Sequence, residues 1–130
     1  MNKLWHDDVR PPPAGWLWAR TNDQAKYFLM LAEREGSPIV ECSLDHDLGY
    51  HDVVLPEDPD ELAEVLILRG QSEETGYDLV CWMIEHNLVP KKVTIHSWNP
   101  EGARHMAARL ARLAPADTEL WVVPFNPKSI

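Results

Sequence analysis

The chain has few cysteines and few basic residues, and each shortage excludes a class of protein. It holds two cysteines and 12 lysines and arginines against 21 aspartates and glutamates. Cys42 and Cys81 lie in apolar runs without metal-ligand spacing, so we expect buried free thiols. The net charge of −9 opposes the attraction to phosphate backbones on which proteins that coat duplex nucleic acid depend.

Long apolar runs and a signal-peptide pattern are also lacking, so we expect a cytoplasmic protein with no membrane partner. What is present is ordinary for one globular domain, with 45% hydrophobic and 25% charged residues. A chain of 130 residues is long enough to bury a core without metal or disulfide support. We therefore expect a single domain over residues 1–130.

Short apolar runs alternate with amphipathic segments, the pattern of an α/β domain. The runs predict strands at residues 3–6, 16–20, 39–44, 92–95 and 119–123. Capping residues predict helices that start after Thr21, Thr75 and Asn99, and the last of these should turn Met106, Leu110 and Leu113 inward. This order predicts a doubly wound, mainly parallel sheet with helices on both faces.

Two segments depart from that scheme. Residues 7–15 contain three consecutive prolines and are too few for an ordinary crossover helix. Either a loop replaces the first helix, or the second strand is misassigned. Residues 50–74 are acidic and interrupted by prolines, and we interpret them as an insertion beside the site with one short helix near 59–68.

Polar residues follow three of the predicted strands directly. Ligands of open α/β sheets bind beyond the carboxyl ends of the strands, so these residues should converge on one rim. The first strand is followed by Asp7 and Asp8, the third by Asp45, His46 and Asp47, and the fourth by His96, Ser97 and Asn99.

Each group of these residues has a chemistry of its own. Clustered carboxylates repel one another unless they bind a cation, and Asp7, Asp8 and Asp45 offer the hard oxygen ligands that Mg²⁺ prefers. The bland interpretation is that they cap helices or fill turns. His46 and His96 are candidates for general base and general acid, and either one alone could equally be structural.

Phosphate binding is expected from donors around the same rim. Ser97 and the helix start after Asn99 present hydroxyl and backbone N–H groups, and Arg10 offers a bidentate contact, with Asp47 beside them. Ordinary turn and cap roles are the alternative for Ser97 and Asn99. Four aromatic rings could stack on a base, namely Trp5, Trp16, Trp18 and Trp98. Large aromatic residues in a small domain more often belong to the core.

The sequence resembles the receiver domains of two-component signalling, in its acidic pair after the first strand and its aspartate after the third. Val123 stands where that family has a lysine before proline. A closer resemblance is to the cyclic-phosphate processing receiver-like family, and it spans nearly the whole chain. The segments that carry it are residues 7–13 (DDVRPPP), 43–49 (SLDHDLG), 75–78 (TGYD) and 96–100 (HSWNP).

This resemblance implies a receiver-like (flavodoxin-like) fold and hydrolysis of a cyclic phosphate on a nucleotide or RNA end. The expected site has catalytic Asp45, His46 and His96, a bound Mg²⁺, and a small phosphate-bearing ligand as the partner. Two alternatives stay open at this point. One is a degenerate receiver that switches protein partners through Asp45, and the other is a module that binds a cyclic nucleotide without cleaving it.

Overall fold

The computed structural model describes residues 2–46, 60, 75–97 and 99–123. The helix expected near residues 59–68 and nearly all of the expected insertion lie outside this description. No helix in the described residues has the length and apolar character needed to cross a membrane. The elements in chain order are β1 (Asn2–His6), β2 (Leu17–Ala19), α1 (Asn22–Arg34), β3 (Ile39–Leu44), α3 (Gly76–Glu85), β4 (Lys92–Ile95), α4 (Pro100–Leu113) and β5 (Glu119–Val122).

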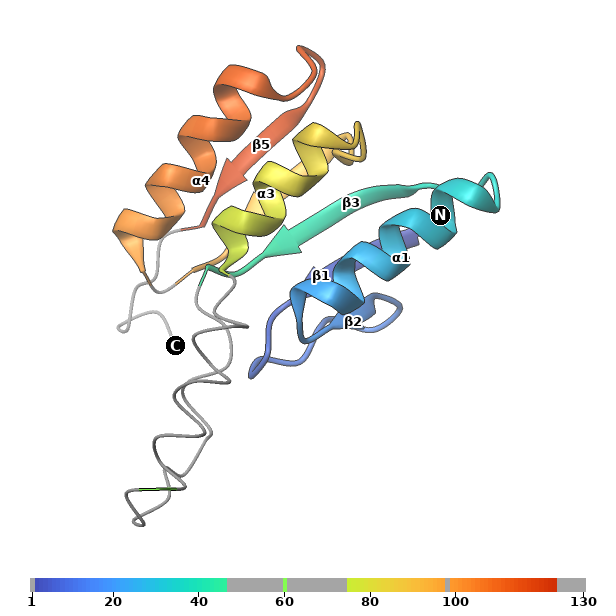
Figure 1. The fold of residues 1–130 in the computed structure, drawn as a ribbon, viewed down its shortest axis with the longest axis horizontal. Coiled ribbons are helices and arrows are strands. Elements are labelled where there is room, and N and C mark those ends of the chain that lie inside the picture. The colour runs from blue at the N-terminus through green and yellow to red at the C-terminus, as the bar shows by residue number, and fades with distance from the viewer. Residues whose placement is uncertain (1, 47–59, 61–74, 98, 124–130) are drawn as a thin grey trace.

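The five strands form one sheet in the order β2-β1-β3-β4-β5, and every neighbouring pair is parallel. This is the flavodoxin-like order that the alternating pattern predicted, so the expected fold class is confirmed. Because all strands run the same way, their carboxyl ends share one edge of the sheet (Figure 1). The polar residues that follow β1, β3 and β4 therefore lie along a common rim.

A loop, and not a helix, connects β1 to β2. Leu4 pairs with Leu17 and His6 with Ala19, so the second strand is a true parallel neighbour. The prolines between them leave no room for a helix, and Gly15 takes a φ of 88° that favours glycine. The reduced first crossover is therefore confirmed.

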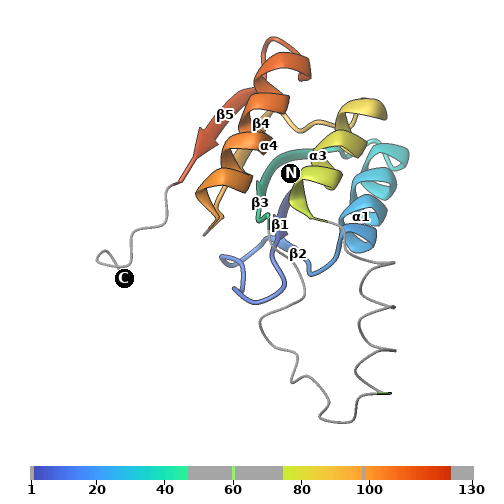
Figure 2. The same cartoon turned by 60° about the vertical axis from the view of Figure 1, so that its left-hand side comes forward.

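The three described helices lie on one face of the sheet (Figures 1 and 2). We expected helices on both faces, and the described part of the chain differs from that expectation. The physical reason is the topology. The crossovers β2–α1–β3, β3–α3–β4 and β4–α4–β5 all step across the sheet in the same direction, and right-handed connections of one direction place their helices on one side.

Each helix begins where a polar side chain satisfies its free backbone donors. The Oγ1 of Thr21 accepts from Gln24 N at 3.1 Å, and the Oδ1 of Asn99 accepts from Gly102 N at 2.9 Å. Before α3, the backbone N–H of Thr75 donates to the carboxylate of Asp78 at 2.8 Å, which is half of a capping box. These caps fix the start of α3 and α4 at the carboxyl rim.

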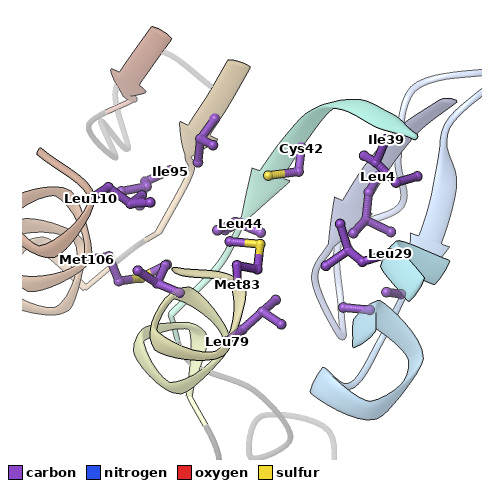
Figure 3. Packing of buried hydrophobic residues seen from close by; sticks show 14 of the residues in the cluster. Leu4, Leu29, Ile39, Cys42, Leu44, Leu79, Met83, Ile95, Met106 and Leu110 are labelled. Atoms are coloured by element: carbon purple, nitrogen blue, oxygen red, sulfur yellow. The ribbon is translucent and has the colours of Figure 1, made fainter. Parts of the chain in front are cut away.

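The core lies between the helices and the sheet face that they cover (Figure 3). Leu113 is an exception to the predicted inward stripe of α4, because its side chain is 47% exposed at the end of the helix. The buried cluster includes Leu4, Leu29, Cys42, Leu44, Leu79, Met83, Val93, Ile95, Met106 and Leu110.

The opposite face of the sheet carries a different row of side chains. The strand register places one residue of each strand side by side across this face, namely Trp18, Trp5, Ser43, Thr94 and Trp121. Side chains alternate between the two faces along a strand. Two residues further on, this same row continues into Asp7 on β1, Asp45 on β3 and His96 on β4, at the rim.

Candidate functional site

Three buried polar side chains meet where β1, β3 and β4 end. Asp7 is 1% exposed, and Asp45 and His96 are each 7% exposed. Their backbones continue the sheet ladder, because Asp45 N donates to His6 O at 3.0 Å and His96 N donates to Leu44 O at 2.9 Å. The predicted convergence of these residues therefore has a rigid basis in strand pairing.

The carboxylate of Asp7 is fully engaged in hydrogen bonds. Its Oδ1 accepts from the backbone N–H groups of Val9 and Arg10, both at 2.9 Å. Its Oδ2 accepts from Arg10 Nε at 2.8 Å and lies 3.0 Å from Nε2 of His96. Burial acts to raise the pKa of Asp7, but these hydrogen bonds and the Arg10 charge outweigh it and lower the pKa to about 2.

Asp45 has the opposite electrostatic character. Burial, followed by the negative charge of Asp7, raises the pKa of Asp45 to about 6. Two interactions act to lower the pKa of Asp45: the positive charge of Arg10, whose Nη2 lies 3.8 Å from Asp45 Oδ1, and the hydrogen bond that His46 N donates at 2.8 Å. Together they do not outweigh the effects of burial and of Asp7. Asp45 is therefore a carboxyl that can change its protonation state near neutral pH.

His96 is held on three sides. Its ring stacks on Trp5 with centroids 4.1 Å apart and planes 10° apart. Nδ1 lies 2.5 Å from Oγ of Ser43, while Nε2 faces Asp7. Burial is the main reason that the pKa of His96 is lowered, so the neutral ring is favoured. A neutral ring that donates from Nε2 to Asp7 and accepts at Nδ1 from the Ser43 hydroxyl satisfies all three groups.

His46 lies apart from His96. Its ring packs on the first turn of α4, where a Cβ added to Gly102 would come 2.5 Å from its Cγ. This is the helix-covered side of the rim, whereas His96 lies over Trp5 on the other side. The structure therefore places His96 against Asp7 and the ring of His46 against α4, and no contact between the two imidazoles is found among the described residues.

Ser97 and Asn99 occupy the turn into α4. The Oγ of Ser97 accepts from Asn99 N at 3.1 Å, and Asn99 caps the helix. Ser97 also donates a hydrogen bond to Asp45, which acts to lower the pKa of that carboxyl. Both residues thus have the cap and turn roles expected as the alternative, at a position next to the carboxylates. Asp47 and Trp98 lie outside the described residues.

Arg10 is drawn into the carboxylate cluster. Besides its bond to Asp7, its Nη2 donates to the backbone oxygen of His96 at 2.5 Å. The loop that carries it is fixed by two indole donors, from Trp5 to Arg10 O at 2.7 Å and from Trp18 to Asp7 O at 2.6 Å. With its side chain 34% exposed, the guanidinium still reaches the surface of the rim.

The predicted metal ligands do come together. Asp7, Asp8 and Asp45 each offer a carboxylate oxygen within 4.8 Å of the others. Hard oxygen donors at this separation fit Mg²⁺. Because the lone pairs of Asp7 are already used by four donors, Asp8 and Asp45 are the better placed ligands and Asp7 is the weaker one.

Sequence reasoning missed Ser43 as a site residue. It lies inside an apolar run, and only its position two residues before Asp45, on the same face of the strand, signals that it points to the rim side. It also missed the pair formed by His6 Nε2 and Asn22 Oδ1, 2.8 Å apart beneath the rim. Burial lowers the pKa of His6 to about 4, so this ring is neutral in the folded protein.

The parallel β2-β1-β3-β4-β5 sheet, with acidic residues after β1 and β3, defines a receiver-type α/β domain. Within that class the chain belongs to the cyclic-phosphate processing receiver domain family, whose family model matches residues 2–112. No curated protein and no solved structure gives a significant match to the chain.

Proposed function

We propose that this domain hydrolyses a cyclic phosphate on a nucleotide or on an RNA-derived molecule. The observation that carries the proposal is Asp45, a buried carboxyl with its pKa raised to about 6 beside the Arg10 guanidinium. Such a carboxyl is populated in both protonation states near neutral pH, which suits a general acid or base. The family to which the chain belongs, the cyclic-phosphate processing receiver domains, supports a cyclic phosphate as the substrate class.

The reaction adds one water molecule across one ester bond. The water oxygen attacks phosphorus, a base takes the water proton, and the bond from phosphorus to one sugar oxygen breaks. An acid gives a proton to that leaving oxygen, so the product is a phosphomonoester with a free hydroxyl. Two proton-transfer groups are therefore required, on opposite sides of the phosphorus.

Asp45 and His46 are the proposed pair for these proton transfers. Ionised Asp45 takes the proton of the water, and His46, adjacent in the chain, protonates the leaving oxygen. His96 is assigned a positioning role, because both of its ring nitrogens already face Ser43 and Asp7. Arg10, Ser97 and Asn99, together with Asp47, are the proposed contacts of the phosphate.

Mg²⁺ fits the carboxylates of Asp8 and Asp45, with Asp7 as a weaker ligand. When bound there, the ion would neutralise charge on the phosphate oxygens. Arg10 adds a second positive charge on the side of Asp7 and orders the loop that presents Asp8.

The test is turnover of a panel of 2′,3′-cyclic mononucleotides by the wild type and by single variants. Asp45→Asn and His46→Ala should each lower kcat by about 10²- to 10⁴-fold, the usual contribution of a positioned acid or base. His96→Gln keeps an N–H donor for Asp7 and should lose much less than His96→Ala. His86→Ala, at the far end of α3, is the matched histidine control.

The dependence of kcat/KM on pH separates a catalytic Asp45 from a structural one. Without added divalent cation, the wild type should show a rising limb centred near pH 6, where Asp45 ionises, and Asp45→Asn should lack it. Unchanged turnover in both Asp45→Asn and His46→Ala would reject the assignment. Tight binding of the cyclic nucleotides without product would show a binding module instead of an enzyme.

A further inference from the structure

A cavity of about 470 Å³ lies beside α4, next to the rim. Its lining comes from His46, from Thr75 and Tyr77 at the start of α3, and from the α4 residues His105, Ala108, Arg109 and Arg112. We call this cavity the α4 groove. Its volume is within the range of small-molecule sites. The two helices that contribute to its lining, α3 and α4, lie side by side (Figure 1).

The groove is basic in a strongly acidic chain. His105, Arg109 and Arg112 are spaced four and three residues apart, so they share one side of α4. Neither arginine has an ion-pair partner among the described residues. Two guanidinium groups that have no carboxylate partner in the described ranges repel one another, and in a chain of net charge −9 they would attract an anion.

Arg109 adds a second observation. Its Nε is buried and has no hydrogen-bond partner in the described part of the chain. A buried donor of a charged group that stays unpaired is costly, and such donors normally have a partner. The guanidinium fork of arginine matches two oxygens of a phosphate, which would supply that partner.

We propose that the α4 groove binds a second phosphate group of the ligand, remote from the cyclic phosphate at the rim. The inference rests on the proposed function, because His46 belongs both to the groove lining and to the proposed proton-transfer pair. The preferred ligand then carries two phosphates, and the second is held by Arg109 and Arg112. This second phosphate can be an internucleotide phosphodiester of an RNA end or a terminal 5′-phosphate of a mononucleotide.

Three substrates distinguish these sources. They are a 2′,3′-cyclic mononucleotide, the same compound with a 5′-phosphate, and a dinucleotide that ends in a 2′,3′-cyclic phosphate. The wild type should have a lower KM for one or both of the compounds with two phosphates, and which one is favoured identifies the source. Equal KM values for all three would overturn the proposal.

The variant that tests the groove is the double replacement Arg109→Ala with Arg112→Ala. It should raise the KM for the favoured compound by about tenfold per arginine, as for the loss of charge-assisted hydrogen bonds, and should leave kcat for that compound similar. The matched control removes the same charge elsewhere, by Arg34→Ala with Arg104→Ala, both exposed and outside the groove lining. Equal effects of the two double variants would mean a general field effect and would overturn the site.

A binding measurement separates this proposal from the proposed function. Calorimetry with a nucleoside 3′,5′-bisphosphate needs no turnover. If no cyclic phosphate is hydrolysed by the wild type, the proposed function fails, and weaker binding in the Arg109/Arg112 double variant than in the control still supports the groove. Equal binding by the wild type and that variant overturns the groove, whatever the turnover.

Discussion

Replacement of Asp45 by asparagine should change how the free energy of unfolding depends on pH. In the folded protein the pKa of Asp45 is raised from 3.8 to about 6, so the folded state binds more protons than the unfolded state between these values. Its contribution therefore makes the wild type less stable as pH rises through this window. Asparagine keeps an acceptor for His46 N but cannot ionise, so the variant should lack this contribution.

The expected magnitude follows from the difference of about two in pKa. Each unit corresponds to about 1.4 kcal/mol, so ionised Asp45 costs about 3 kcal/mol of folding free energy above pH 6. His6 acts in the opposite direction over nearly the same range, because its pKa is lowered from 6.5 to about 4. The unfolded state then binds more protons, and stability increases by about 3 kcal/mol as pH rises through that range.

The contributions of Asp45 and His6 nearly cancel in the wild type between pH 4 and 6, so the change left over is the rise in stability that the lowered pKa of His96 adds. Asp45→Asn should gain stability with rising pH more steeply than the wild type, because His6 and His96 then act without the opposing contribution of Asp45. His6→Gln keeps a donor for Asn22 and should gain less stability than the wild type as pH rises, because the contribution of His6 is gone. Urea unfolding at intervals from pH 4 to 7 measures these slopes, and an Asp45→Asn profile parallel to the wild type would refute the reasoning.

Three further predictions concern the residues around the rim. Gly76→Ala should destabilise the fold by about 3 kcal/mol or more in urea unfolding, because the new Cβ would overlap the carbonyl oxygen of Asp45; an unchanged unfolding midpoint would contradict this packing. Ser43→Ala should cost about 1–3 kcal/mol and shift the imidazole ¹⁵N resonances of His96, whose Nδ1 loses its partner; unchanged resonances would mean that the hydrogen bond is absent. Asp8→Asn should reduce the rise in melting temperature that Mg²⁺ gives the wild type, and equal rises would exclude Asp8 as a ligand.

Much of the fold could be predicted from local signals. The capping residues Thr21 and Asn99 mark helix starts that the structure confirms by hydrogen bonds from Gln24 and Gly102. The β-branched and apolar run at Ile39–Leu44 is a central strand, as its pattern predicted. The placement of the three described helices on one side was not predicted, because it depends on the direction in which successive crossovers step across the sheet, and strand order is not a local property.

The site was predictable as a location but less so as a set of partners. Asp7, Asp45 and His96 converge because each follows a strand of one parallel sheet. Their hydrogen bonds depend on register, which pairs Leu44 with Ile95 and so places His96 level with Asp45. Because successive side chains point to opposite faces of a sheet, His46 then points to the face that the helices cover, where its ring lies against Gly102. No signal in the sequence alone fixes that register, which is why the histidines were expected to work as a pair.

The hydrogen bond from Gly76 N to His46 O, at 2.9 Å, joins two residues that are thirty positions apart in the numbering. This hydrogen bond joins the segment that follows β3 to the start of α3 at the rim. The junction itself does not depend on how many residues separate His46 from Gly76. Closing a longer excursion costs only about 0.6 kcal/mol for each doubling of its length. A segment of different size between these two residues would therefore cost the fold little, and the strands and the polar residues of the rim would keep their places.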